Sequence, residues 1–220
     1  MKIVFYGDSI TDASRLRSNN DAGRVKEEYS DNPRAYGSGY VFLTATELLF
    51  TKPHEYTILN RGIGGDRLPQ IYARMNLDVW SEKPDVISIL VGVNDVNRGD
   101  NPNFTELSRF GRLYRMMLND TLEKLPNVKI ILCEPFTLRD DPEPCPEKNI
   151  QHVREYAEEV RKIAEEFDLP FVALQKKLDE AAKIYGAEAC CHDLLHPALV
   201  GSKIISDEWL KVFNKEILNK

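Results

Sequence analysis

The sequence predicts an α/β domain in which a parallel sheet is covered by helices on both faces. Short runs rich in branched apolar residues recur along the chain, and segments with helical spacing separate them. Two of these runs, 86–91 and 128–133, are almost continuously apolar, which is typical of strands buried on both faces of a parallel sheet. Strand alternating with helix five times over indicates a doubly wound fold.

The expected elements can be placed in order along the chain. The expected strands cover 2–6, 56–60, 85–91, 128–133 and 171–174. The clearest helix lies within 149–167, because its apolar residues recur three or four positions apart: Val153, Tyr156, Val160, Ile163 and Phe167. The other expected helices cover roughly 40–51, 68–80, 105–124, 175–185 and 201–218.

One segment interrupts this alternation. Residues 12–38 are polar and rich in turn-forming residues, and they are long for a first connection from strand to helix, for which about 2–6 residues are usual. Inserts of this kind more often form a lid, a binding loop or a subunit contact than a plain connection. We therefore expect one domain over 1–220, with 12–38 as an insert or lid-like loop.

Composition and charge exclude several classes of protein. The 220 residues are 42% hydrophobic and 29% charged, as in globular proteins, and the net charge of −6 offers no basic field to a nucleic acid. No apolar run approaches the ~20 residues that span a bilayer, and the first residues form a strand-sized run rather than a secretory signal. The four cysteines do not make a disulfide framework. We expect a cytoplasmic protein with reduced thiols and neither a nucleic-acid nor a membrane partner.

Small and polar residues follow each of the first three expected strands. Asp8 and Ser9 follow the first strand, NRGIGGDR (60–67) follows the second, and GVND (92–95) follows the third. In an open parallel sheet, ligands bind beyond the carboxyl ends of the strands, near the point where the strand order reverses. If the order is 2-1-3-4-5, the first and third strands flank that point, and Ser9 and Asn94 face each other across the crevice.

A carboxylate and an imidazole lie close together near the other end of the chain. Asp193 and His196, in CCHDLLHP (190–197), are three residues apart, which on a helical turn brings the bases of their side chains within about 5–6 Å. The carboxylate can then accept a hydrogen bond from one ring nitrogen and leave the other free as a base. A serine hydroxyl is a poor nucleophile unless such a base takes its proton. The chain thus contains a nucleophile, an orienting acid and a base in the order Ser9, Asp193, His196.

These segments resemble the four blocks of the SGNH (GDSL) hydrolase superfamily. GDSITD, NRGIGGD, GVND and DLLH occur in the family's order and cover the chain nearly from end to end. The resemblance implies a three-layer, flavodoxin-like fold with a five-stranded parallel sheet of order 2-1-3-4-5, and an enzyme that needs neither a cofactor nor a metal. Two other aspartates in these blocks, Asp12 and Asp95, are expected to cap or brace loops rather than to take part in catalysis.

The resemblance also implies a role for each of five residues. Ser9 is the expected nucleophile, His196 the base, and Asp193 the residue that orients the base. The backbone N–H groups of Ser9 and Gly65 and the side-chain amide of Asn94 are the expected oxyanion hole. Gly65 is chosen over its neighbouring glycines because the second glycine of the family's G-G-D string aligns there.

Within that superfamily the sequence is most similar to carbohydrate acetyl esterases of the acetylxylan esterase kind, on GDSITD, GVNDV and LHP. This likeness implies a serine esterase that removes acetyl groups from xylo-oligosaccharides or other small-molecule sugar esters, and it allows a homo-oligomer. Lipases, lysophospholipases and thioesterases share the four blocks and are the alternative. No apolar lid or amphipathic membrane-binding segment is apparent in the sequence. The insert 12–38 is rich in Arg, Asn and Asp, which suits a hydroxyl-rich ligand better than an acyl chain.

Two classes without an activated serine are also considered. One is a zinc protein, because thiolate, imidazole and carboxylate are all zinc ligands. Its candidate ligands are Cys190, Cys191, His192, Asp193 and His196. Adjacent cysteines point in divergent directions, however, and no second ligand pair occurs at a typical spacing. The other is a non-catalytic sugar-binding module, because fold alone does not assign function.

Overall fold

Within the part of the chain that the structure describes, five strands run parallel in one sheet, in the order β2-β1-β3-β4-β5. The structure is a computed structural model, and it describes residues 1–17, 32–97, 103–139 and 152–219. Its strands are β1 (Lys2–Gly7), β2 (Thr57–Asn60), β3 (Val86–Leu90), β4 (Lys129–Cys133) and β5 (Phe171–Val172). The predicted fold class and strand order are confirmed, although the fifth strand is only two residues long.

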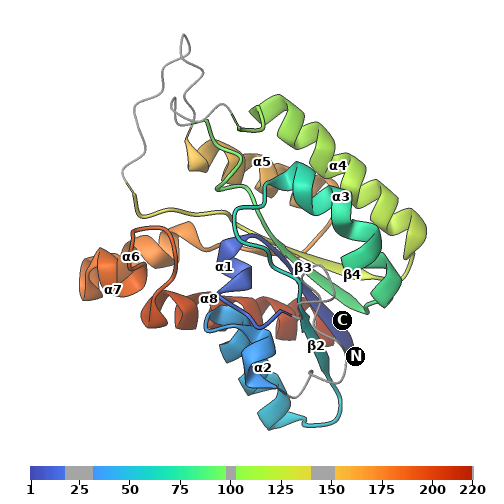
Figure 1. Cartoon of the computed structure of the whole chain (residues 1–220), viewed down its shortest axis with the longest axis horizontal. Helices are drawn as coiled ribbons and strands as arrows, with labels where there is room; N and C mark the ends of the chain where they lie inside the picture. The colour runs from blue at the N-terminus through green and yellow to red at the C-terminus, as the bar shows by residue number, and fades with distance from the viewer. Residues whose placement is uncertain (18–31, 98–102, 140–151, 220) are drawn as a thin grey trace.

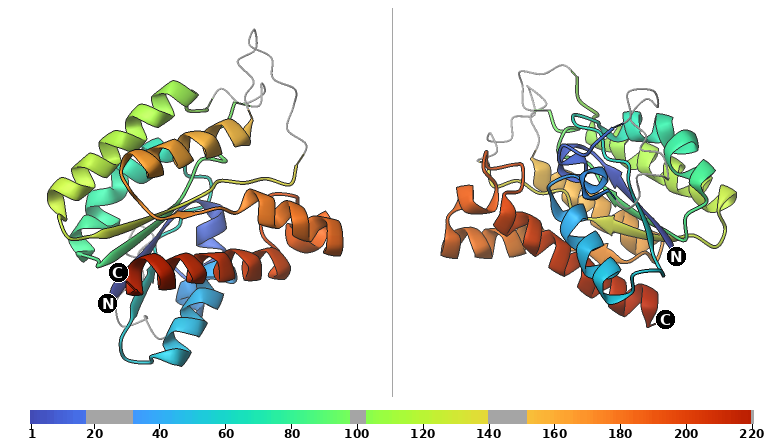
Figure 2. Two further views of the ribbon diagram at one scale, coloured as in Figure 1. Left: turned by 180° about the vertical axis from the view of Figure 1, so that it is seen from behind. Right: turned by 60° about the horizontal axis from the view of Figure 1, so that its bottom comes forward.

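Helices cover both faces of this sheet, as Figures 1 and 2 show. One face carries α3 (Leu68–Asp78), α4 (Leu107–Lys124) and α5 (Val153–Glu166). The other face carries α2 (Tyr40–Thr51) and α8 (Leu199–Phe213), which continues into a π-helical turn, η5 (Asn214–Leu218). Near the carboxyl ends of the strands lie α1 (Ser9–Asp12), α6 (Gln175–Tyr185) and α7 (Ala187–Cys190). Two 3₁₀ turns are η2 (Pro33–Tyr36) and η3 (Trp80–Glu82).

The sheet is packed on both faces because its central strands are apolar at nearly every position. All five residues of β3 are buried, and their one polar side chain, Ser88, accepts a hydrogen bond from the indole N–H of Trp209 at 2.9 Å. The Trp209 ring lies 4.9 Å from the ring of Phe5 and 4.8 Å from that of Phe213, between ring centres. Truncating a buried aromatic side chain of this kind costs about 3–5 kcal/mol of stability. The strand ends therefore stand on a tightly packed support.

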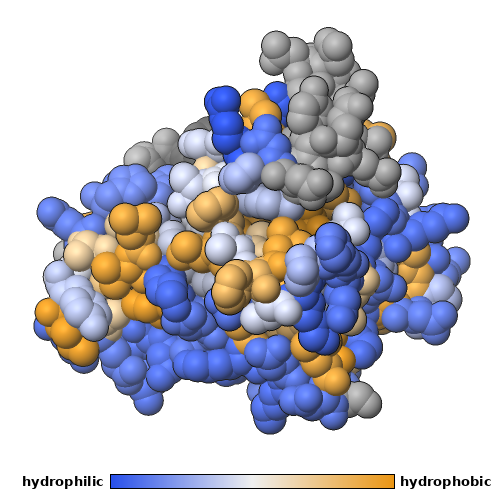
Figure 3. Space-filling view, turned by 90° about the horizontal axis from the view of Figure 1, so that it is seen from below, coloured by the Kyte–Doolittle hydropathy of each residue, from blue (hydrophilic) through white to orange (hydrophobic). Residues whose placement is uncertain are grey.

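Figure 3 shows the surface formed by the helices on the α2 and α8 side, where apolar side chains in orange lie among hydrophilic ones. Large apolar side chains with high exposure include Phe50 of α2 and Leu199 of α8, which are 84% and 79% exposed, and Ile184 of α6, which is 73% exposed. Isolated exposed apolar residues are common on monomers, so the expected homo-oligomer stays a prediction. None of the helices formed by the described residues is long and apolar enough to cross a membrane.

The described ends of the insert after β1 lie against each other. The backbone N–H of Leu16 donates to the carbonyl of Arg34 at 2.7 Å, and that of Ser38 donates to the carbonyl of Ala13 at 2.9 Å. The insert therefore leaves and rejoins the fold at one place, next to α1. The prediction of a lid-like loop falls mainly on residues 18–31, which lie outside the described residues.

Candidate active site

Ser9 lies directly beyond the carboxyl end of β1, as the first residue of the short helix α1. Asp8 caps this helix, because its Oδ1 accepts the backbone N–H of Ile10 at 3.0 Å. The helix ends at once, since Ala13 and Ser14 both have positive φ angles, of 42° and 59°. The run of glycine, aspartate and serine thus builds a tight turn that holds the serine hydroxyl at the edge where open parallel sheets bind ligands.

The three residues predicted as nucleophile, base and orienting acid form one hydrogen-bonded chain. Ser9 Oγ lies 2.8 Å from Nε2 of His196, and Nδ1 of His196 lies 2.8 Å from Oδ2 of Asp193. When Nδ1 carries a proton and donates a hydrogen bond to the carboxylate, Nε2 is free to accept the proton of the serine hydroxyl. The arrangement therefore fits the activation of Ser9 as a nucleophile.

The Asp193 carboxylate is held in its ionised form. Desolvation opposes ionisation, but hydrogen bonds from the backbone and the ring of His196 and from the backbone of Leu195 outweigh it and hold the pKa of Asp193 well below its usual range. The two backbone N–H groups both donate to Oδ1, at 2.6 Å from His196 and 3.0 Å from Leu195. An ionised carboxylate in this place stabilises a protonated imidazole.

The loop that carries this pair is a closed turn rather than the helical turn considered from the sequence. Cys191 and Pro197 form an antiparallel bridge, and the backbone N–H of Ala198 donates to the carbonyl of Cys190 at 2.8 Å. At its tip, Leu194 has a positive φ of 65°. Asp193 and His196 still meet, because the bridge closes the turn and the carboxylate bonds the backbone as well as the ring of the histidine.

The three glycines after β2 differ in what their N–H groups do. That of Gly62 donates to Asn60 Oδ1 at 2.9 Å, and that of Gly64 donates to Asp12 Oδ2 at 3.0 Å. Among the described residues, nothing accepts a hydrogen bond from the N–H of Gly65. Gly65 has a φ of 82°, and a Cβ added to it would meet nothing within 4 Å. The positive φ therefore accounts for a glycine at this position.

Asn94 and Asp95 lie in the turn after β3. The side-chain amide of Asn94 donates to the carbonyl of Asp66 at 3.0 Å, which places it beside the Gly65–Asp66 segment and leaves its second N–H to donate elsewhere. Both oxygens of Asp95 accept the backbone N–H of Leu68, at 3.2 and 3.1 Å, at the start of α3. Asp95 therefore braces a loop, as expected, and Asn94 adds a donor next to Gly65.

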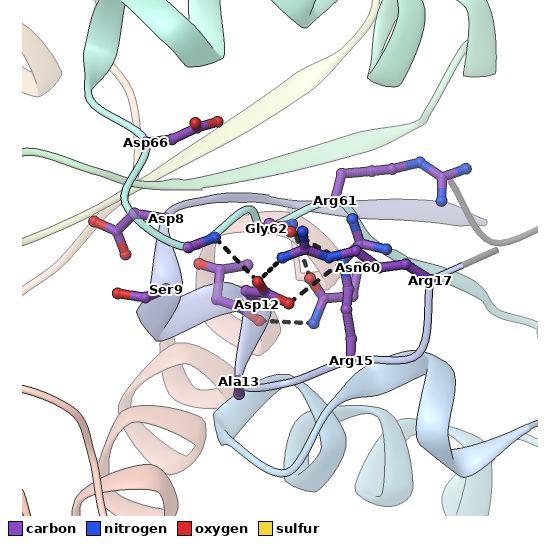
Figure 4. Close-up of polar contacts among 12 residues, drawn as sticks. Asp8, Ser9, Asp12, Ala13, Arg15, Arg17, Asn60, Arg61, Gly62 and Asp66 are labelled. Atoms are coloured by element: carbon purple, nitrogen blue, oxygen red, sulfur yellow. Dashed lines mark hydrogen bonds and ion pairs between the residues drawn. The ribbon is translucent and has the colours of Figure 1, made fainter. Parts of the chain in front are cut away.

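Asp12 joins α1 to the loop that contains the glycines, as Figure 4 shows. Its Oδ2 accepts the N–H of Gly64 and also pairs with Arg17. In the same view Ser9 points away from these contacts, although it belongs to the same helical turn. Asn60 at the end of β2 adds a second link, because its amide donates to the carbonyl of Thr11 at 2.7 Å. Asp12 therefore braces the loop that contains Gly65, as expected.

Asp8 and Asp95 are buried carboxyl groups near the site. Burial raises the pKa of Asp8 to about 7, against the hydrogen bond from Ile10, and the charges of Asp95 and Asp66 add to the rise. Burial also raises the pKa of Asp95 to about 7. Oδ2 of Asp8 has no hydrogen-bond partner among the described residues, which makes ionisation of this carboxyl still less favourable.

A cavity of about 390 Å³ opens beside Ser9 and His196. Serine residues line much of it, namely Ser14, Ser38 and Ser202 in addition to Ser9. Ile10, Pro197 and His192 also contribute to the walls, and the His192 ring stacks on that of His196 with 5.9 Å between centres. The cavity offers hydroxyl and imidazole groups to a ligand.

One contact to the Asp193–His196 pair was not foreseen. Arg139, six residues beyond the end of β4, donates to the Asp193 side chain from Nη2 at 2.9 Å and to its backbone carbonyl from Nε at 3.0 Å. No sequence pattern marks this arginine, because the two residues are 54 positions apart and the fold alone brings them together.

The residues of the zinc alternative are not gathered as that hypothesis requires. In the described chain, a group of side chains close enough to share a metal consists of His192, Asp193 and His196, and two of these bond to each other. Cys190 and Cys191 are buried free thiols outside this group. The fourth cysteine of the sequence, Cys145, lies outside the described residues. The donor set thus fits a hydrogen-bonded pair better than a thiolate-rich zinc site.

Fold and site together define an α/β enzyme of the carboxylic ester hydrolase class. A model of the GDSL-like Lipase/Acylhydrolase family matches residues 5–204, and the chain belongs to that family. The resemblance seen in the four sequence blocks is therefore confirmed.

Individual relatives agree with this assignment. An acetylxylan esterase of Geobacillus stearothermophilus is 32% identical over 214 residues, which cover 96% of this chain and 92% of that protein. A structure from Parabacteroides merdae, described as a GDSL-like lipase, matches with a TM-score of 0.83 at 38% identity over 96% of this chain and 94% of that one. Axe2, an acetylxylan esterase from Geobacillus stearothermophilus, matches with a TM-score of 0.78 at 30% identity over 96% and 93%.

Proposed function

We propose that this protein is a serine esterase that removes acetyl groups from sugars, such as acetylated xylo-oligosaccharides, through an acyl-enzyme on Ser9. The observation that carries the proposal is the unbroken hydrogen-bonded chain from Ser9 through His196 to Asp193, with 2.8 Å at each step. A hydroxyl has little reactivity toward an ester without such a base. A binding module has no use for this arrangement.

In the first half of the reaction, Nε2 of His196 takes the proton of Ser9 as Oγ attacks the ester carbonyl. The tetrahedral intermediate collapses when His196 passes that proton to the leaving sugar oxygen, and the acyl group stays on Ser9. Water then attacks the acyl-enzyme with His196 again as the base, and His196 returns the proton to Ser9 Oγ as the acid leaves. Throughout, the Asp193 carboxylate keeps the imidazole oriented and stabilises its protonated form.

The oxyanion is stabilised by the backbone N–H groups of Ser9 and Gly65 and by the side-chain amide of Asn94. The hydrogen bonds described above support this choice, because they occupy the N–H groups of Gly62 and Gly64 and leave that of Gly65 to donate. Preorganised donors of this kind are worth about 2.7–4 kcal/mol each in the transition state.

The shape and lining of the cavity support a short acyl group on a sugar. A space of about 390 Å³ with serine and histidine side chains in its lining offers hydrogen-bonding groups to a hydroxyl-rich ligand, and it is small for a long acyl chain. One relative is named an acetylxylan esterase, and a structure of Axe2 is described as that of an acetyl-xylooligosaccharide esterase.

The known catalytic mutants of Axe2 support the same roles. Solved structures of that enzyme include catalytic mutants in which a serine, an aspartate or a histidine is replaced by alanine. Its aspartate and histidine are separated by the same interval along the chain as Asp193 and His196.

The proposal is tested with nitrophenyl esters of increasing acyl length and with acetylated xylo-oligosaccharides. We expect kcat/KM to be highest for acetyl, and Ser9→Ala to lose at least about 10³-fold in kcat with an unchanged melting temperature. Ser108→Ala, at an exposed serine of α4, is the matched control and should keep wild-type activity. A rate that rises steadily with acyl length argues for a lipase or thioesterase instead, and full activity in Ser9→Ala contradicts the mechanism.

A further inference from the structure

The Asp193 carboxylate accepts four hydrogen bonds, two at each oxygen. Oδ1 accepts the backbone N–H groups of Leu195 and His196. Oδ2 accepts the ring nitrogen Nδ1 of His196 and also Nη2 of Arg139, at 2.8 and 2.9 Å. A carboxylate has about four acceptor positions, so the group is fully occupied and Arg139 supplies one of its four bonds.

The Arg139 side chain is held in place by a second contact with Asp193. Its Nε donates to the backbone carbonyl of Asp193 at 3.0 Å, so that the guanidinium spans the backbone and the side chain of one residue. Its own backbone is fixed as well, because its N–H donates to Thr137 Oγ1 at 3.1 Å. The neighbouring N–H of Leu138 donates to the carbonyl of Leu194 at 2.8 Å. The segment after β4 is therefore hydrogen-bonded to the loop of Asp193 through two successive residues, Leu138 and Arg139.

We propose that Arg139 is a positioning residue that fixes the Asp193 carboxylate for its hydrogen bond to His196. The proposal rests on the function proposed above, and it adds a residue that acts through Asp193. Two contacts from one planar guanidinium restrain both the position and the rotation of the carboxylate. Without them, Oδ2 keeps only its bond to the imidazole, and the loop loses one of its supports.

The test compares Arg139→Gln and Arg139→Lys with wild type on a nitrophenyl acetate. For Arg139→Gln we expect kcat to fall about 10-fold and KM to change little. Arg139→Lys keeps the charge but cannot form both bonds, so it should restore only part of kcat. Arg115→Gln removes an arginine of similar exposure that pairs with Glu159 and Glu166, and it should behave as wild type.

A second background separates positioning from substrate contact. If Arg139 acts through the carboxylate, Arg139→Gln should have no further effect on kcat in Asp193→Asn. A rise in KM in both backgrounds, or an equal fall of kcat in both, overturns the proposal. Ser9→Ala is measured alongside: if it is inactive while Arg139→Gln matches wild type, this inference fails alone, whereas an active Ser9→Ala defeats the proposed function itself.

Discussion

Single residues in this site are distinguished by the hydrogen bonds that their neighbours already make. Gly62 and Gly64 give their N–H groups to Asn60 and Asp12, whereas the N–H of Gly65 stays available. A motif of adjacent glycines does not say which one faces the reacting carbonyl. The donors already occupied at Gly62 and Gly64 favour Gly65, the glycine that the resemblance also indicates.

Gly65 and Gly186 offer a matched pair of substitutions. Both have positive φ angles, of 82° and 90°, and an added Cβ meets nothing within 4 Å at either place. We expect Gly65→Ala and Gly186→Ala each to lower the free energy of unfolding by about 1–3 kcal/mol, through backbone strain alone. Only Gly65→Ala should also lower kcat, by about 10²-fold or more, because it turns the proposed oxyanion donor away. Urea unfolding and acetyl-ester kinetics measure both effects, and equal activities in the two variants would contradict the role of Gly65.

At the scale of elements, the loop of Asp193 and His196 depends on how α7 packs against α8. The loop lies between these two helices, and the bridge between Cys191 and Pro197 closes its base. Gly201 in the first turn of α8 allows this packing, since a Cβ there would lie 2.1 Å from the carbonyl oxygen of Cys190. The position of His196 is therefore set partly by a residue outside the hydrogen-bonded chain of Ser9, His196 and Asp193.

Gly201→Ala should separate the two helices and displace the loop between them. We expect kcat to fall at least about 10-fold and the free energy of unfolding to fall by about 1–3 kcal/mol. Gly111→Ala in α4 is the control: its added Cβ would lie 2.4 Å from the end of the Glu159 side chain, which can move aside. Wild-type kcat in Gly201→Ala, with the predicted loss of stability, would show that the loop is positioned independently of α8.

At the scale of the whole molecule, stability should depend on pH through the buried carboxyls Asp8 and Asp95. Their folded pKa of about 7 lies above the value of about 3.9 in an unfolded chain. The stability that they contribute is thus complete below about pH 4 and is lost as the pH rises to 7, by at most about 1.4 kcal/mol per pH unit and group.

Urea unfolding between pH 5 and 8 measures this dependence. Wild type should lose stability across the range, and Asp95→Asn should flatten the curve, both by removing one titrating group and by removing a charge that raises the pKa of Asp8. Asp207→Asn, at an exposed ion pair on α8, should leave the slope as in wild type. The same steep slope in Asp95→Asn would exclude Asp95 as a source of the dependence.

Much of this fold was predictable because its elements are marked by patterns among residues that are neighbours in the sequence. Nearly continuous apolar runs mark β3 and β4, and the rule that ligands bind at the carboxyl edge brings Ser9 and Asn94 into consideration together. The contact of Arg139 with Asp193 was not predictable, since it joins distant loops that only the folded sheet aligns. The bridge-closed turn at Cys191 was missed for a similar reason: spacing alone does not separate it from a helical turn.

The order of the site residues along the chain has a consequence for biosynthesis. Ser9 and His196, which share a hydrogen bond, are separated by 187 positions. Translation at about 5–20 residues per second therefore takes roughly 10–40 s to pass from one to the other. During that time a ribosome-bound polypeptide has Ser9 but not His196, so under the proposed mechanism ester cleavage begins only after both residues have been made and the fold has brought them together.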